Sequence, residues 1–222
     1  MRFFFIIATI AMMTLVGCTT PPVEHLRTSA PEARRCCQAG ELGPSRNAIV
    51  RTAVKLVGTK TIKSNGRRIA YDCAGVTRAV FLAHGIDLYE GDPGDSDTNG
   101  VQIIHAHIQQ QGTFHRGPVA HPGDLVFFND TWDYNGDGKV NDPLTHVGIV
   151  ERQEANGTII FISRVADTIE RYHMNLNLPH AHKTADGRIL NDYLRRKDAA
   201  HPSNTGYLTG ELFAQFATRV GH

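Results

Sequence analysis

The sequence predicts an α+β domain in which helices come first along the chain and a small antiparallel sheet follows. Two observations lead to this prediction. Apolar residues recur at helical spacing between residues 45 and 112, and short runs rich in Val, Ile and Phe follow between residues 123 and 163. Segregated helices and strands are typical of α+β proteins. With 222 residues, of which 41% are hydrophobic, the chain is long enough to bury one core.

Three helices are predicted in the first half of the chain. The first covers residues 45–58 and ends at a glycine. The second covers residues 72–85, where Asp72 is a suitable N-cap and Gly85 a suitable stop. The third is amphipathic and covers residues 101–112.

Strands and one further helix are predicted in the second half. Asn156-Gly157 lies between two apolar runs and is a strong signal for a β-hairpin. Residues 207–220 return to helical spacing and predict a C-terminal packing helix. The predicted strands are GDLVFF at residues 123–128, HVGIVER at residues 146–152 and TIIFIS at residues 158–163.

The N-terminal residues are predicted to direct export. Residues 1–17 have a charged start and an apolar stretch too short to span a bilayer, which is typical of a signal peptide. The stretch runs into LVGC, which resembles the lipobox of bacterial lipoproteins. That resemblance implies cleavage before Cys18 and acylation of its thiol, and Thr19 after it favours the outer membrane, facing the periplasm. An ordinary signal peptide with a chance cysteine is the alternative.

A flexible tether is predicted between this lipid anchor and the globular domain. Residues 18–44 carry Pro, Ala and charged residues without an apolar period, and the domain then covers residues 45–222. Cys36 and Cys37 are adjacent, about 3.8 Å apart at Cα, so a disulfide between them would be strained. Pairing between molecules, further acylation and no role at all stay open for these two cysteines.

The charge balance excludes one class of function. The formal net charge is +1, and no basic stripe or phosphate-binding glycine loop is present. A protein with so weak a field does not attract nucleic acid. We therefore expect no nucleic-acid partner.

Cys73 is a lone thiol in a domain that is predicted to be exported, and this makes it conspicuous. It lies in the first turn of the second predicted helix, where unpaired N–H groups and the helix dipole favour a thiolate. The small neighbours Ala74 and Gly75 leave room for a substrate carbonyl. The alternative is a small hydrophobic residue of the core.

Three motifs in order resemble the NlpC-type cell-wall cysteine peptidases, a papain-like family. They are DCAGV at residues 72–76, PGDLVFF at residues 122–128 and THVGIV at residues 145–150. The resemblance implies a papain-like fold, with Cys73 as the nucleophile and His146 as the general base. The family's usual serine after the cysteine is Ala74 here, a change that keeps the position small.

The family normally carries a third polar residue that orients the imidazole. In this chain the position falls at Ser163, whose hydroxyl can accept the imidazole N–H but stabilises an imidazolium less than a carboxylate would. Asp167 is the alternative. Since Ser163 departs from the family's pattern, the site is either weakened or completed by another residue.

The resemblance implies a lipid-anchored peptidoglycan hydrolase that cleaves an amide bond in the stem peptide. We expect a monomer whose partners are the stem peptides and, through the anchor, the membrane, with no cofactor required for the chemistry. Two alternatives stay open. One is an amidase or acyltransferase on the same fold, and the other is a catalytically weak or inactive wall-binding lipoprotein.

The segment that precedes His146 predicts a structural Ca²⁺ site. Asp, Asn and Asp occupy the first, third and fifth positions of a calcium loop and Gly138 its sharp turn, but Leu144 stands where a bidentate glutamate is usual. The alternative is a polar turn without an ion. The candidate ligands are Asp133, Asn135, Asp137, the Lys139 carbonyl, and Asn141 or Asp142.

Overall fold

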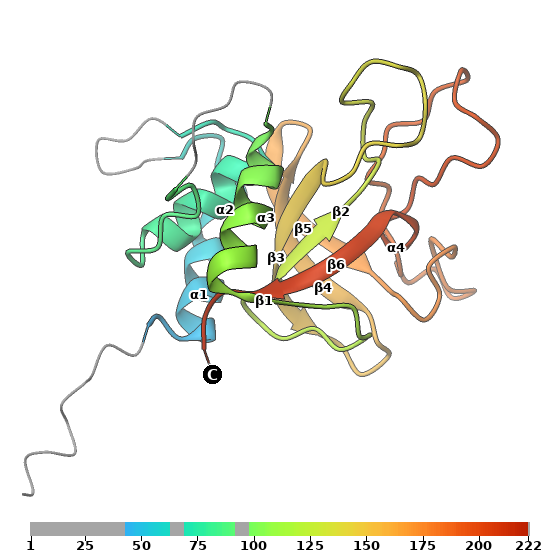
Figure 1. Cartoon of the computed structure of the whole chain (residues 1–222). Helices are drawn as coiled ribbons and strands as arrows, with labels where there is room; N and C mark the ends of the chain where they lie inside the picture. The colour runs from blue at the N-terminus through green and yellow to red at the C-terminus, as the bar shows by residue number, and fades with distance from the viewer. Residues whose placement is uncertain (1–42, 63–68, 92–97, 222) are drawn as a thin grey trace, which may run out of the picture. The chain divides into compact units, whose positions relative to one another are not determined.

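Three helices cover one face of an antiparallel sheet, as Figure 1 shows. The computed structural model describes residues 43–62, 69–91 and 98–221. The predicted signal peptide, Cys18, and nearly all of the predicted tether with its two cysteines lie outside these ranges. Within the described ranges, no helix is both long and apolar enough to cross a membrane.

The three helices predicted in the first half are confirmed, and each begins at a side-chain cap. In each case the oxygen of the N-cap side chain accepts a hydrogen bond from the backbone N–H three residues later. The N-caps are Ser45, Asp72 and Asn99. The helices are α1 (Arg46–Leu56), α2 (Cys73–Leu82) and α3 (Gly100–Gln111).

The described residues form a six-stranded sheet of order β1-β6-β2-β3-β4-β5, in which every neighbouring pair is antiparallel. The three predicted strands correspond to β2, β3 and β4, and the predicted hairpin at Asn156-Gly157 joins β3 to β4. The strands are β1 (Thr113–His115), β2 (Leu125–Phe128), β3 (His146–Gln153), β4 (Ile159–Val165), β5 (Thr168–Met174) and β6 (Phe213–Thr218).

The central strands are buried on both faces, which explains why their sequences are continuously apolar. Along β2, Leu125 and Phe127 pack against the helices, whereas Val126 and Phe128 point into a second core on the opposite face. That second core is closed by Leu194 and by other residues of the C-terminal third. The predicted α+β arrangement of helices on an antiparallel sheet is therefore confirmed.

The helix predicted over residues 207–220 is wrong. Only Thr209–Leu212 is helical (α4), and the next six residues form β6 between β1 and β2. Leu212 and Phe216 both belong to the second core, so their helical spacing reflects two elements that bury the same face. The short strand β1 and the half-exposed strand β5 complete the sheet at its edges and are not predicted by the apolar pattern.

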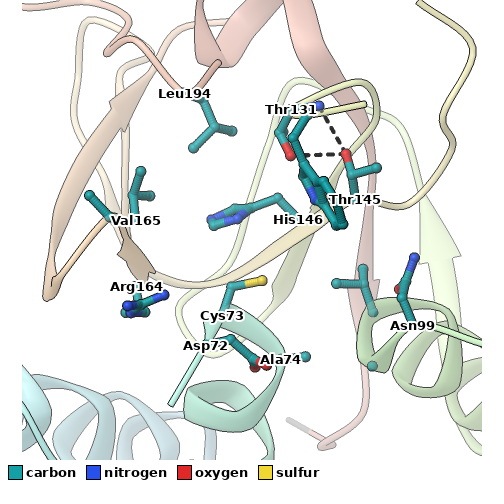
Figure 2. Close-up of a pocket in the computed structure, with 14 residues that line it drawn as sticks. Asp72, Cys73, Ala74, Asn99, Thr131, Thr145, His146, Arg164, Val165 and Leu194 are labelled. Carbon is teal, nitrogen blue, oxygen red and sulfur yellow. Dashed lines mark hydrogen bonds between the residues drawn. The ribbon is translucent and has the colours of Figure 1, made fainter. Parts of the chain in front are cut away.

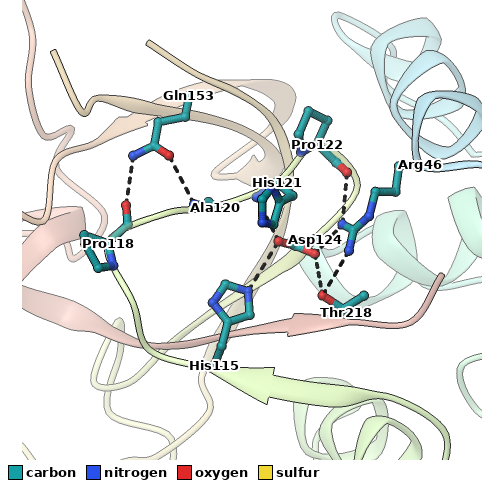
Figure 3. A network of polar contacts seen from close by, with 9 residues as sticks. All are labelled: Arg46, His115, Pro118, Ala120, His121, Pro122, Asp124, Gln153 and Thr218. Atoms are coloured by element: carbon teal, nitrogen blue, oxygen red, sulfur yellow. Dashed lines mark hydrogen bonds and ion pairs between the residues drawn. The ribbon is translucent and has the colours of Figure 1, made fainter. Parts of the chain in front are cut away.

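One buried charge joins α1 to the sheet (Figure 3). The Asp124 side chain is fully buried, and its Oδ1 accepts hydrogen bonds from Arg46 Nη1 at 2.6 Å and Thr218 Oγ1 at 2.7 Å. Its Oδ2 accepts the backbone N–H of His121 at 2.8 Å. Burial raises the pKa of the Asp124 carboxyl, but these hydrogen bonds outweigh it, and the pKa lies below its ordinary value.

We predict that Asp124→Asn lowers the free energy of unfolding by about 3 kcal/mol in urea denaturation, because the variant leaves the Arg46 charge without its partner. Glu151→Gln is the matched control. Its ion pair with Arg171 has the same 2.6 Å separation, but the Arg171 side chain is 39% exposed, so a loss below about 1 kcal/mol is expected. Equal losses in the two variants would contradict this account.

The same contact has a defined pH dependence. The folded-state pKa of Asp124 is depressed, so its contribution to stability is complete above the ordinary value of 3.8 and is lost as the pH falls through the lower folded value. The difference in unfolding free energy between the parent and Asp124→Asn should therefore shrink as the pH is lowered below 3.8.

Candidate active site

Cys73 is the first residue of α2, as the position of the Asp72 cap predicts. The Asp72 carboxylate accepts the Gly75 backbone N–H at 2.7 Å, which ends the preceding extended segment and starts the helix. Gly75 is required there, since a Cβ at this position would lie 1.9 Å from the backbone oxygen of Ala70. The cap and the glycine together place the thiol at the end of the helix that faces the sheet.

His146 and Ser163 come from neighbouring strands and contact each other. His146 opens β3 and Ser163 lies on β4, and both side chains are buried. Ser163 Oγ lies 2.9 Å from His146 Nε2 and 2.7 Å from the backbone oxygen of Val147. The structure thus brings the predicted third residue to the imidazole. Asp167, the alternative, is 97% exposed and lies 4.0 Å from Arg164 instead.

The two contacts of Ser163 assign the imidazole tautomer. A hydroxyl has one proton, and here it is donated to the Val147 carbonyl. The oxygen can then only accept from His146, so the proton of the neutral ring is on Nε2. Nδ1 is left with a free lone pair, which is the form that a general base needs.

Cys73 and His146 line the same pocket, which has a volume of about 340 Å³ (Figure 2). Its wall also contains Trp132, which is 51% exposed, and Leu194 from the C-terminal third. Cys73 and His146 both belong to the described part of the chain, and there no hydrogen bond joins the thiol to the imidazole. Such contacts often tighten only when substrate binds.

The Cys73 thiol is protonated at rest, contrary to the thiolate expected from its place in the helix. Burial is the largest effect and raises its pKa to about 11, and the negative charge of Asp72 adds to this. Hydrogen bonds from the backbone of Val147, Ala74 and Cys73 itself lower the pKa by less. The desolvation of Cys73 therefore raises its pKa by more than the N–H groups at the start of the helix lower it.

His146 is neutral at rest for the same reason. Burial lowers the pKa of the imidazole to about 3, and its partner Ser163 carries no charge that would favour the imidazolium. The pair consequently starts as thiol and imidazole, and proton transfer has to accompany attack on a substrate.

Two donors in the pocket wall have no hydrogen-bond partner among the residues that the structure describes, and neither was predicted from the sequence. They are Arg164 Nε and Asn99 Nδ2, and the two residues lie on opposite sides of Cys73 in Figure 2. The Arg164 guanidinium also stacks over Tyr71, at 5.0 Å from the ring centroid. Arg164 directly follows Ser163 in the sequence, and this adjacency is the signal from which its position beside the site could have been predicted.

The predicted calcium ligands lie together in the loop between β2 and β3. Asp133 accepts backbone N–H groups of Gly136 and Gly138, both at 2.8 Å, and Asn141 Nδ2 donates to Asp137 at 3.0 Å. In the described ranges, no three His, Cys, Asp or Glu side chains are grouped so that they could hold a metal ion. Any ion in this loop would need amide and backbone oxygens as well.

Comparisons with known proteins identify one informative relative. The chain is 24% identical over 132 residues to the gamma-D-glutamyl-L-lysine dipeptidyl-peptidase of Bacillus cereus. This similarity covers 60% of the chain but only 33% of the relative, so the chain spans about a third of that protein's length. It confirms the resemblance that the three motifs predict. No protein-family model matches the chain.

Among solved structures, the chain is similar to the NlpC/p60 domain of the peptidoglycan hydrolase SagA, with 24% identity. The similarity covers 58% of this chain and 88% of that one, and the superposition is weak, with a TM-score of 0.34.

We predict that alkylation of Cys73 by iodoacetamide accelerates roughly tenfold per pH unit from pH 6 to pH 9, because the thiolate is the reactive form and the thiol pKa is about 11. Stopped reactions, with the modified peptide quantified by mass spectrometry, measure this rate. A rate already constant between pH 6 and pH 8 would mean that Cys73 is ionised at rest.

Proposed function

We propose that this protein is an exported, lipid-anchored cysteine peptidase with a papain-like domain, which hydrolyses an amide bond of peptidoglycan stem peptides. Cys73 is the nucleophile, His146 the general base and Ser163 the positioning residue. The observation that carries the proposal is the meeting of three segments at one pocket, namely the start of α2, the start of β3 and the end of β4. The sequence similarity to a dipeptidyl-peptidase supports it.

Attack begins with the transfer of the Cys73 proton to His146 Nδ1, while the sulfur adds to the substrate carbonyl carbon. Since both groups are neutral at rest, the charges appear only as the bond forms. The carbonyl oxygen becomes an oxyanion, for which the backbone N–H groups of Val147, Ala74 and Cys73, which hydrogen-bond the sulfur at rest, are candidate donors.

Collapse of this intermediate breaks the C–N bond. His146 returns its proton to the leaving amine, and the acyl group stays on Cys73 as a thioester. A water molecule then gives a proton to His146, and its oxygen attacks the thioester carbon. The released sulfur takes the proton back, so that the carboxylic acid product leaves and the thiol is restored.

Ser163 acts through His146 rather than on the substrate. Its hydrogen bond to Nε2 leaves Nδ1 as the basic nitrogen for each of the proton transfers. A neutral hydroxyl suits a base that starts neutral, whereas it stabilises the transient imidazolium less than a carboxylate would. The site is therefore compatible with catalysis, at a rate limited by how well the imidazolium is stabilised.

The relative's name suggests a substrate feature that this pocket suits. In a γ-D-glutamyl amide, the α-carboxylate of the glutamate is free and lies close to the scissile bond. Arg164 places a cation beside Cys73, and among the described residues its acidic contact is the exposed Asp167 at 4.0 Å. We infer that Arg164 binds this carboxylate, which would orient the carbonyl towards the sulfur.

The lipid anchor at Cys18 completes the proposal. It would hold the enzyme on the membrane, most simply at the outer membrane facing the periplasm, while a tether of about 25 residues lets the domain reach on the order of 25–30 Å. Mass spectrometry of the N-terminal peptide tests this, since an unacylated peptide beginning at another residue would remove the anchor from the proposal.

We predict that Cys73→Ala abolishes clearing in a zymogram against purified cell wall. The double variant Cys36→Ala/Cys37→Ala is the control for loss of a thiol and should clear like the parent. Clearing by Cys73→Ala equal to the parent would show that the nucleophile assignment is wrong. Mass spectrometry of the products identifies the bond, because an amidase or an acyltransferase on the same fold exposes a different new terminus.

We predict that Arg164→Met lowers kcat/KM for a γ-D-glutamyl muropeptide by about 10–100-fold, mainly through KM, because one charge-assisted hydrogen bond to the substrate is lost. Arg164→Lys should restore part of the loss, since it keeps the charge without the planar fork. Arg171→Met on β5 is the control and should change neither constant. If a substrate whose carboxylate is amidated responds to Arg164→Met as strongly as the free acid, Arg164 does not bind that group.

A further inference from the structure

The loop between β2 and β3 folds around the oxygen atoms of its own side chains. Asp133 accepts three hydrogen bonds with distances of 3.2 Å or less, from the backbone N–H groups of Gly136, Asp137 and Gly138. Asn135 Oδ1 accepts the Asp137 N–H at 2.9 Å. These bonds hold the side-chain oxygens of Asp133 and Asn135 against the backbone of the loop.

The side-chain oxygens of Asp133, Asn135 and Asp137 can still accept further contacts. A carboxylate has about four lone-pair positions and an amide oxygen two. Asp133 uses three positions and Asn135 one. Asp137 accepts from the Lys139 backbone and from Asn141, and the Lys139 ammonium lies 3.5 Å from it. Each of the three side chains therefore has at least one lone pair without a donor.

Asp142 gives a separate observation that points to a cation site. Its side chain is only 3% exposed, and Oδ1 accepts the Asn135 backbone N–H at 3.2 Å, so the carboxylate faces the loop. Its Oδ2 is buried and has no hydrogen-bond partner within the described part of the chain. A buried carboxylate oxygen without a donor is costly unless a cation satisfies it.

We propose that this loop binds one Ca²⁺ ion, held directly by the side chains of Asp133, Asn135 and Asp137 and by the Lys139 carbonyl, and by Asp142 through a bridging water. All of these ligand atoms are oxygens, from carboxylates, an amide and a backbone carbonyl, which suits the large and flexible calcium shell better than magnesium or zinc. Without the usual bidentate glutamate, we expect a Kd on the order of 0.1–1 mM, as in extracellular calcium modules.

The ion would act on the segment that ends at His146. Asp142 and Asp130 close the neck of the loop, with Asp130 N–H to Asp142 O at 2.8 Å and Asp142 N–H to Asp130 Oδ1 at 2.7 Å. Next to this neck, Thr131 donates its backbone N–H and its hydroxyl to Thr145 Oγ1, both at 2.9 Å, and both threonines line the active-site pocket. His146 is the following residue.

The backbone conformation at the two ends of the loop explains why a bound ion would stabilise it. Asp130 and Leu144 are two non-glycine residues with left-handed backbones, each with φ of 54°. L-residues adopt this conformation only when surrounding contacts hold it. A calcium ion bridged to Asp142 would hold both ends of the loop in this conformation and thereby fix where β3 begins.

Terbium luminescence of the full chain tests binding without any reference to activity. Trp132 and Tyr134 lie beside the loop, with ring centroids 5.2 Å apart, and would sensitise a Tb³⁺ ion bound there. We expect saturable emission on excitation near 280 nm that Ca²⁺ displaces and equimolar Mg²⁺ does not. Emission that does not saturate, or that magnesium displaces equally well, would overturn the proposal.

Thermal melts of variants locate the ion. At about 10 mM Ca²⁺ the parent should gain about 5 °C in Tm over the chelated protein, and Asp133→Ala/Asp137→Ala should gain nothing. Asp142→Asn should also lose the gain, yet melt at or above the parent in chelator, because it removes the unpartnered buried charge. The control Asp186→Asn, in an exposed turn, should respond to calcium like the parent. A full calcium response in Asp142→Asn would contradict the proposal.

The effect on His146 rests on the proposed function and is measured separately. Chelator should lower peptidase activity of the parent several-fold and leave Asp133→Ala/Asp137→Ala unchanged at the chelated level. If calcium binds and raises Tm while activity does not change, the effect on His146 is refuted and the calcium site stands. If no preparation is active, the peptidase proposal fails, and the luminescence result still decides the ion.

Discussion

Burial of both faces of the central strands is the constraint on which the rest of this structure depends. Helices cover one face of β2, β3 and β4, and the C-terminal third covers the other. Every charged or titratable group near these strands must therefore be neutral or fully partnered. Asp124 is charged because Arg46, Thr218 and a backbone N–H surround it. Cys73 and His146 also have hydrogen-bond partners, but these carry no opposite charge and do not offset burial, so both groups are neutral.

Burial of the central strands also explains why a neutral residue, Ser163, contacts His146. A carboxylate at this position would be a second buried charge opposite a ring that is neutral at rest. The hydroxyl instead uses its proton on the Val147 carbonyl and its lone pair on His146, so that all polar atoms of the contact are satisfied without a net charge. The resulting site starts without an ion pair and generates charge only during attack, where backbone N–H groups at the helix end can stabilise it.

Much of this arrangement could be predicted from sequence because it depends on local signals. The Asp72 cap fixes the start of α2 and hence the place of Cys73, and Asn156-Gly157 fixes the hairpin that brings the Ser163 side chain into contact with His146. The remainder depends on contacts between distant segments. Leu212 and Phe216 have helical spacing but belong to α4 and β6, and only pairing with β1 and β2 reveals the strand. The protonated thiol could not be predicted either, since its burial arises from tertiary packing.

The account makes one covalent claim, that the acyl group of the stem peptide passes through a thioester on Cys73. Mass spectrometry of enzyme mixed with a γ-D-glutamyl muropeptide and quenched in acid within the first turnover tests it most directly. The account predicts that the peptide containing Cys73 gains the mass of the acyl fragment, and that hydroxylamine removes this mass. Products released in the first turnover without any adduct on Cys73, or with the adduct on another residue, would contradict it.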